Sequence, residues 1–155
     1  MHTTITVNGA DGLRFLSSLE QAMQLDRPLP RALEWLMRSQ DPSIEVDAEL
    51  ADELAEFVDE LAARGMLRGL EEPLLFSPRI GDEVVIVRDA LLELQAAARR
   101  APRSWCLIAR GTRARLVARH DGLGRLVLND GPYAGEIAFA SEQTMTRARA
   151  RRRAR

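Results

Sequence analysis

Few residues in this sequence have the type and spacing that catalysis or metal binding needs. The chain has one cysteine, Cys106, and two histidines, His2 and His120, so an intramolecular disulfide and a Cys/His zinc site are both excluded. A nucleophile needs a base within hydrogen-bond reach. His120 precedes a turn sequence that begins at Asp121, and Cys106 lies in the apolar run 105–108, where a cysteine acts as a small hydrophobe. We therefore expect no catalytic residue, no metal and no cofactor, and we do not expect an enzyme.

The charged residues, by contrast, are gathered into separate blocks. The 155 residues carry a formal net charge of −1, which excludes a uniformly basic protein, and 46% hydrophobic residues exclude a wholly disordered chain. Residues 39–63 contain acids and no cation, whereas arginines dominate residues 99–125 and recur through 147–155. The chain has no lysine, which excludes a lysine-containing phosphate loop. Charge blocks mark partner surfaces or solvated faces.

The acidic block coincides with the clearest helical pattern in the chain, over residues 47–64. Apolar residues repeat there at helical spacing, at Leu50, Leu54, Phe57, Val58 and Leu61. Gly65 follows, where a helix end favours glycine. The opposite face carries the candidate partner-binding residues Glu49, Asp52, Glu53, Glu56, Asp59 and Glu60. A hard-cation site needs ligands that converge from several directions, so a basic surface on a partner suits one helical face better.

The basic block contains a predicted strand with alternating arginines. Over residues 113–119, one face carries Arg113, Arg115 and Arg119 with Val117, and the other carries Ala114, Leu116 and Ala118. Three interpretations of such a strand are open. It binds the phosphates of a nucleic acid, it discourages strand-to-strand aggregation at a sheet edge, or it binds a protein partner. A nucleic-acid site would also use the tail residues Arg147, Arg149, Arg151, Arg152, Arg153 and Arg155. The strand lacks the aromatic residues on which single-stranded bases stack.

Local patterns predict the elements that position these residues. Helices are expected from Asp11, from Pro30, over 47–64 and over 89–100, and strands at 5–7, 74–76, 84–87, 105–108, 113–119, 126–128 and 137–139. We expect one compact domain over 1–146, with a helical lobe at about 11–100 and a β-meander at about 104–140. A mobile tail at 147–155 would follow. The absence of long apolar runs and of an export signal predicts no membrane partner and a cytoplasmic location.

The predicted order of helices and hairpin over residues 13–94 resembles a winged-helix domain. Segment 57–67, from Phe57 through Gly65 to Leu67, resembles the junction between the third helix and the wing. The resemblance implies an α+β fold with a helical, winged-helix-like N-terminal part, followed by a small antiparallel β-meander. Phosphates would repel the carboxylates of 47–64 in a DNA groove. The resemblance therefore implies a protein or peptide partner, as in the small recognition domains of peptide-modifying systems.

Segments 5–13 and 27–33 resemble the opening of phage tail-completion or virion-morphogenesis proteins, which implies a role in assembly. Together the patterns predict a non-enzymatic binding or adaptor module. It would dock to a protein partner, or to a second copy of itself, through the acidic helix face and the arginine-rich strand. The alternative is a nucleic-acid-binding regulator or a phage-type assembly component that uses the basic strand and the tail.

Overall fold

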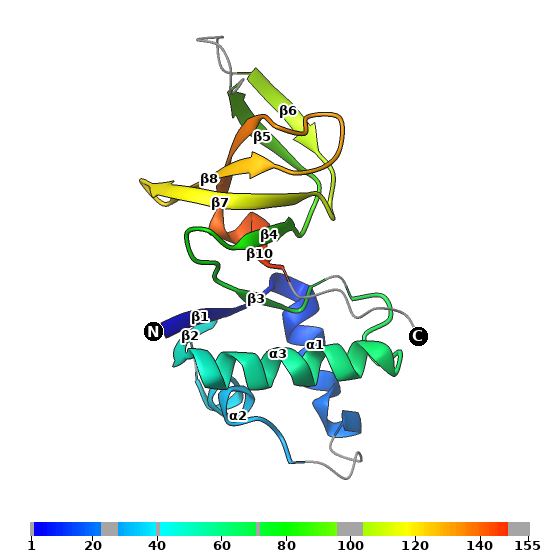
Figure 1. The fold of residues 1–155 in the computed structure, drawn as a ribbon. Coiled ribbons are helices and arrows are strands. Elements are labelled where there is room, and N and C mark those ends of the chain that lie inside the picture. Colours follow the sequence, from blue (N-terminus) through cyan, green and yellow to red (C-terminus); the bar gives the residue numbers. More distant parts are fainter. Residues whose placement is uncertain (1, 23–27, 40, 71, 96–103, 149–155) are drawn as a thin grey trace. The chain divides into compact units, whose positions relative to one another are not determined.

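The chain folds into two compact units that follow one another in sequence, residues 1–76 and 77–155 (Figure 1). The computed structural model describes residues 2–22, 28–39, 41–70, 72–95 and 104–148, with the backbone alone for 20–22. Each unit has a hydrophobic core of its own. We call them the first unit and the second unit.

In the described residues, the first unit combines a three-stranded antiparallel sheet with three helices. In chain order its elements are β1 (His2–Val7), α1 (Gly9–Ala22), α2 (Arg31–Arg38), β2 (Ser43–Asp47), α3 (Ala48–Ala63) and β3 (Leu74–Phe76). The strand order is β2-β1-β3, and Ile5 of the central strand lies opposite Ile44 and Phe76. The core draws on the sheet and on all three helices, because Ile5 and Phe76 belong to the same buried cluster as Phe15, Leu33 and Leu54.

The start of α1 is set by a close approach of the backbone. The helix begins at Gly9, so Asp11, the expected N-cap, lies inside the first turn and pairs with Arg14. Gly12 is buried, and a Cβ atom at this position would lie 2.8 Å from the carbonyl oxygen of Pro73. Only glycine therefore lets α1 lie this close to the chain that leads into β3.

The predicted helix over 47–64 is confirmed as α3. The Asp47 side chain accepts a hydrogen bond from the Leu50 N–H at 2.9 Å, which satisfies one of the free donors of the first turn. At the other end Gly65 has a φ of 75°, and the Met66 N–H donates to the Leu61 carbonyl at 3.0 Å. These bonds close the last turn in the way that a left-handed glycine permits.

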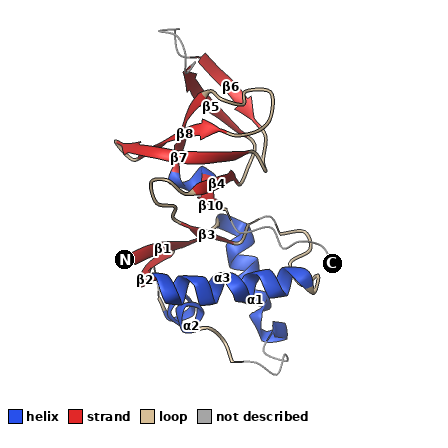
Figure 2. Cartoon of the chain, in the orientation of Figure 1, coloured by secondary structure: helices blue, strands red, loops and turns tan. Residues whose placement is uncertain are grey.

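In its described residues, the second unit is built on one seven-stranded antiparallel sheet. Its elements are β4 (Glu83–Ile86), β5 (Ala90–Gln95), β6 (Ser104–Ile108), β7 (Arg113–His120), β8 (Leu123–Leu128), β9 (Ile137–Ser141), a short 3-10 helix (Glu142–Thr144) and β10 (Met145–Arg147). The strand order is β10-β4-β7-β8-β9-β5-β6. Figure 2 shows the strands in red. Alternate residues of these strands, including Ile86, Leu94, Leu116, Leu126 and Met145, are buried together in one core. We call the opposite side of the strands the outer face of the sheet.

The predicted fold class is wrong, because the structure is mostly β, with 40% strand against 29% helix. The predicted wing hairpin does not form. Leu74–Phe76 pairs with β1 in the first unit, whereas Glu83–Ile86 pairs with β7 and β10 in the second. The boundary between the units thus falls between these two strands, and the winged-helix resemblance does not describe the fold.

The fourth helix predicted over 89–100 is also wrong. Residues 90–95 form β5, which pairs with β6 and β9, and residues 96–100 lie outside the described residues. Asp89 does not cap a helix, since its carboxylate accepts a hydrogen bond from the Arg110 N–H at 2.7 Å. Leu92 and Leu94 are buried while Leu91 is exposed, which is the period of a strand.

The small meander is replaced by part of a larger sheet. β7, β8 and β9 are consecutive neighbours and the hairpin turn at Asp121 is confirmed, but β6 pairs with β5 rather than with β7. The sequence patterns also missed β2 and β10. Arg147, assigned to the tail, belongs to β10 and lies opposite Val84.

Candidate interaction surfaces

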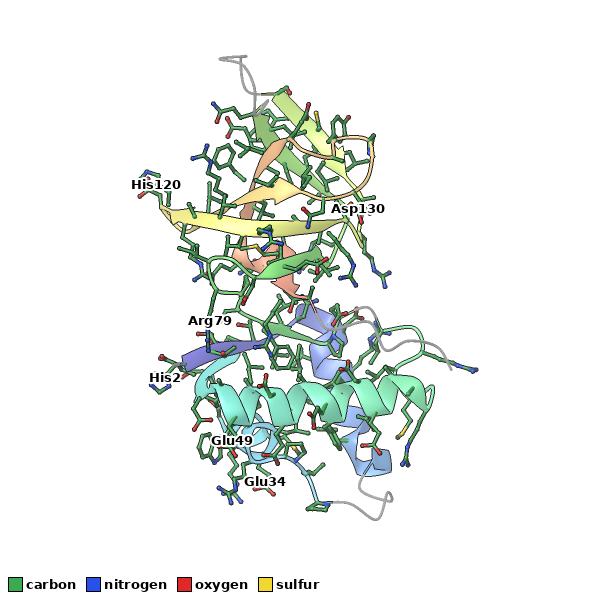
Figure 3. All side chains as sticks on the ribbon, in the orientation of Figure 1. His2, Glu34, Glu49, Arg79, His120 and Asp130 are labelled. Carbon is green, nitrogen blue, oxygen red and sulfur yellow. The ribbon has the colours of Figure 1, made fainter. Side chains whose placement is uncertain are left out.

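The acidic face of α3, defined as Glu49, Asp52, Glu53, Glu56, Asp59 and Glu60, stands on a firmly packed helix. The other side of α3 is buried in the core of the first unit, at Ala51, Leu54, Phe57, Val58 and Leu61. Four of the six carboxylates are exposed, and Asp59 and Glu60 are half-buried. Glu49 projects from the first turns of the helix (Figure 3). The structure therefore brings together all six residues that the sequence selected.

The charges of the acidic face have small and opposing effects on the stability of α3. Glu49, Glu53 and Glu56 follow one another at spacings of four and three residues, and like charges at such spacings destabilise a helix by about 0.2–0.5 kcal/mol per pair. Glu49 in the first turn gains from the helix dipole, but that effect fades beyond the first turn. The Glu60 carboxylate forms an ion pair with Arg64 at 3.1 Å. The main stabilisation of α3 therefore comes from the packing of its buried side.

The arginine strand, defined as Arg113, Arg115 and Arg119 of β7, contacts other residues of the second unit. The Arg113 guanidinium lies 3.0 Å from the Glu83 carboxylate on β4. The Arg119 guanidinium lies 3.2 Å from the Glu142 carboxylate of the 3-10 helix. Two of the three positive charges are therefore compensated locally, which the sequence alone did not indicate.

Backbone carbonyls occupy further donors of these arginines. Arg115 donates to the Gly81 carbonyl at 3.2 Å, and Arg119 also donates to the Pro78 carbonyl. The expected alternation is also interrupted, because β7 has a register irregularity between Leu116 and Ala118. These arginines hold the segment 78–83 in place. Binding of phosphates by the same guanidinium groups would have to break these contacts.

Of the tail residues assigned to the predicted nucleic-acid surface, Arg147 belongs to the described part of the chain. Arg147 is half-buried in β10, and the Ala148 N–H donates to the Glu83 carbonyl at 2.8 Å, continuing the edge of the sheet. Arg149, Arg151, Arg152, Arg153 and Arg155 lie outside the described residues.

The two residues considered for catalysis lie in separate places. The side chain of His120 is 89% exposed at the β7–β8 turn and lies 3.3 Å from the Asp121 carboxylate (Figure 3). Cys106 is half-buried on β6. The Cys106 thiol contacts the Ser104 hydroxyl at 3.9 Å and interacts with the phenol of Tyr133. A thiol and an imidazole that do not meet supply no nucleophile–base pair.

The Tyr133–Cys106 contact was missed from the sequence. Tyr133 belongs to the β8–β9 loop and, with Leu107, lines a cavity of about 120 Å³ at the end of β6. Ligand pockets are usually about 300–1,000 Å³, so this cavity is too small for a typical substrate. In the described part of the chain, no group of three or more His, Cys, Asp or Glu residues is placed to hold a metal ion.

A second feature missed from the sequence is an apolar patch on β5 and β6. Leu91, Trp105 and Leu107 are 64%, 68% and 63% exposed. They share the outer face of the sheet, because the residues that alternate with them, Leu92 and Ile108, are buried in the core. The alternation of the large apolar residues Trp105 and Leu107 with their neighbours in 104–108 is a sequence signal for this patch, but only if β6 is known to be an edge strand.

Comparisons of the chain with models of protein families, with curated proteins and with solved structures found no match. None of the helices in the described residues is long and apolar enough to cross a bilayer. The function must therefore be argued from the surfaces themselves.

Proposed function

We propose that this chain is a non-enzymatic binding module that docks to a basic protein partner through the acidic face of α3. The observation that supports the proposal is the exposure of Glu49, Asp52, Glu53 and Glu56 on one side of a helix whose other side is buried. Such a row produces a negative potential that attracts cationic surfaces and speeds their association.

The arginine strand has less free positive charge to offer a partner than its sequence indicates. Glu83 and Glu142 already compensate Arg113 and Arg119. Exposed cations on the outer face of the sheet are Arg115 and Arg125, which lie on neighbouring strands. We therefore assign the main docking surface to α3 and only a supporting electrostatic role to β7.

A labelled peptide with the sequence of residues 147–155 serves as a cationic probe of the acidic face. We expect the full chain to bind the peptide at about 0.05 M salt and much more weakly at about 0.5 M, as measured by fluorescence anisotropy. The triple variant Glu49→Gln, Glu53→Gln, Glu56→Gln should bind about tenfold more weakly, because each exposed charge contributes about 0.2–1 kcal/mol.

The matched control is Glu34→Gln, Asp41→Asn, Glu45→Gln, which removes three exposed carboxylates of the same unit outside α3. This control should bind the peptide almost as well as the unmodified chain. If both triple variants lose affinity equally, the net charge of the unit attracts the peptide and the acidic face has no special role.

Nucleic acid is the alternative partner, and the exposure of Arg115 and Arg125 is the observation in its favour. Binding of unrelated DNA duplexes by the full chain and by a chain that ends at Ala148 separates the two functions. We expect negligible duplex binding by either chain. Salt-dependent binding by both would move the docking surface to the outer face of the second unit.

A further inference from the structure

In the part of the chain that the structure describes, the two sheets end in four edge strands, and three of these strands have features that discourage pairing with another chain. β2 carries Glu45 and Asp47, β3 has only three residues, all buried, and β10 has three residues including Arg147. Short edges and charged edges are the usual protection against strand-to-strand association. β6 differs, because its five residues, 104–108, include no charged residue and no proline.

The β6 edge, which has no charged residue and no proline, carries the apolar patch defined above. Within the described residues β6 pairs with β5 alone. Leu91 lies directly opposite Leu107, and Glu93 lies opposite Trp105, so Trp105 and Leu107 form the outermost row on this face. A neutral edge strand with two large exposed apolar side chains is a template for another strand.

We propose that β6 pairs antiparallel with β6 of a second copy of this chain, with the two-fold axis at Cys106. In this register Trp105 lies opposite Leu107 of the second copy. By symmetry, Leu107 lies opposite Trp105 of the second copy. Each row across the outer face then reads Leu91, Leu107, Trp105, Glu93, with the last two from the second copy. Aromatic–aliphatic cross-strand pairs of this kind stabilise strand pairing, in addition to the apolar area that they bury.

The carboxylates of β5 do not oppose this pairing. The nearest carboxylate on the outer face, Glu93, lies on β5, so the two β5 strands would be three strand spacings apart, about 14 Å. That separation exceeds the screening length of about 8 Å at physiological salt. The two-fold axis uses both β6 edges and leaves the charged β10 edges outside, so the assembly closes as a dimer.

Cys106 provides a reporter of the register because it is the only cysteine in the chain. Residues directly opposite on antiparallel strands have Cα atoms about 4.5–5.5 Å apart, which lies within the range of about 4.4–6.8 Å that a disulfide bridges. Mild oxidation with copper–phenanthroline should therefore trap a covalent dimer of the full chain. The thiol faces the core side of β6, beside Tyr133, so trapping requires the strands to pair rather than merely to collide.

The test is the mass of the full chain in solution, measured by sedimentation across a wide range of concentrations at about 0.5 M salt, where attraction between exposed charges is screened. We expect a dimer. Leu107→Arg should weaken it by at least about tenfold, because a charge on an edge strand opposes pairing. Leu13→Arg is the matched control, since Leu13 is also 63% exposed but belongs to α1. Should Leu107→Arg fail to fold, Trp105→Glu tests the same pair.

A monomer at every concentration, or equal effects of Leu107→Arg and Leu13→Arg, would overturn the proposal. A dimer that resists trapping at Cys106 would also overturn it, because the strands would not be in register. A monomer that instead binds extended peptides along β6 is a further contrary result. Because the proposed acidic-face binding weakens at high salt, failure of one proposal leaves the other intact.

Discussion

The chain has one tyrosine, Tyr133, and one cysteine, Cys106, and the two lie beside each other. The titration of tyrosine therefore reports on the β8–β9 loop without a signal from any other tyrosine. Tyr133 is half-buried and packs against the core of the second unit together with Cys106. The two residues are twenty-seven positions apart, and no local pattern links them. The contact therefore depends on the sheet that places β6 next to this loop.

We predict that the phenol of Tyr133 titrates above its usual pKa. The hydrogen bond with Cys106 is the main cause that raises the pKa, followed by the charge on the Cys106 sulfur, burial, and the nearby Glu136 carboxylate. The folded state therefore holds the phenolic proton more tightly than the unfolded chain, whose tyrosine pKa is about 10. The stability contributed by this proton is fully present below about pH 10 and is lost as the pH rises through the folded-state pKa.

Ultraviolet absorbance of tyrosinate measures this titration directly. Cys106→Ala should return the pKa of Tyr133 toward the ordinary value, whereas Ser104→Ala should leave it raised, because Ser104 contacts the thiol and not the phenol. If Cys106→Ala has no effect, the thiol is not the cause of the raised pKa.

At the scale of elements, α3 shows what local sequence can predict. Its apolar spacing, the cap at Asp47 and the stop at Gly65 all act within a few residues, so the sequence contains the whole signal. β5 shows the limit. Segment 90–95 consists of alanine, leucine, glutamate and glutamine, which favour helices. Pairing with β6 and β9 overrides that preference, and β9 lies more than forty residues away.

The candidate surfaces follow the same division. The six carboxylates of the acidic face were predictable because helical spacing places them together. The ion pair between Arg113 and Glu83 was not predictable, because the two residues are thirty positions apart and come together only through the pairing of β4 with β7. The winged-helix prediction was wrong because strand pairing between distant residues is also not contained in the local sequence. A turn between two short strands suggested a hairpin, but the strands entered different sheets.

We predict that the cap of α3 stabilises the first unit measurably. Asp47→Ala removes the acceptor for the Leu50 N–H and should lower the free energy of unfolding by about 1 kcal/mol. Urea unfolding followed by the fluorescence of Trp35, with Trp105 replaced by phenylalanine, measures the change. Asp41→Ala removes the same charge from an exposed loop position and should cost much less. Equal losses would show that charge, not capping, is responsible.

At the scale of the whole molecule, two separate cores predict two separate unfolding events. Trp35 lies in the first unit and Trp105 in the second, so each unit has one fluorescent reporter. Leu54 is fully buried in the first core. Leu54→Ala should lower the stability reported by Trp35 by about 2–5 kcal/mol, because it leaves a cavity.

The transition reported by Trp105 should stay in place. The experiment uses two single-tryptophan backgrounds, Trp35→Phe and Trp105→Phe, each with and without Leu54→Ala. A shift of both transitions by the same amount would show that the two units unfold as one cooperative body.

The order in which strands leave the ribosome differs between the two sheets. Every strand of the first sheet lies before residue 77, so its pairing can be completed while the rest of the chain is still being made. The second sheet pairs β4 with β10, which ends at Arg147. β4 therefore keeps one edge without its partner strand until residues 145–147 have been synthesised, and during this interval the unpaired edge is open to association with other strands.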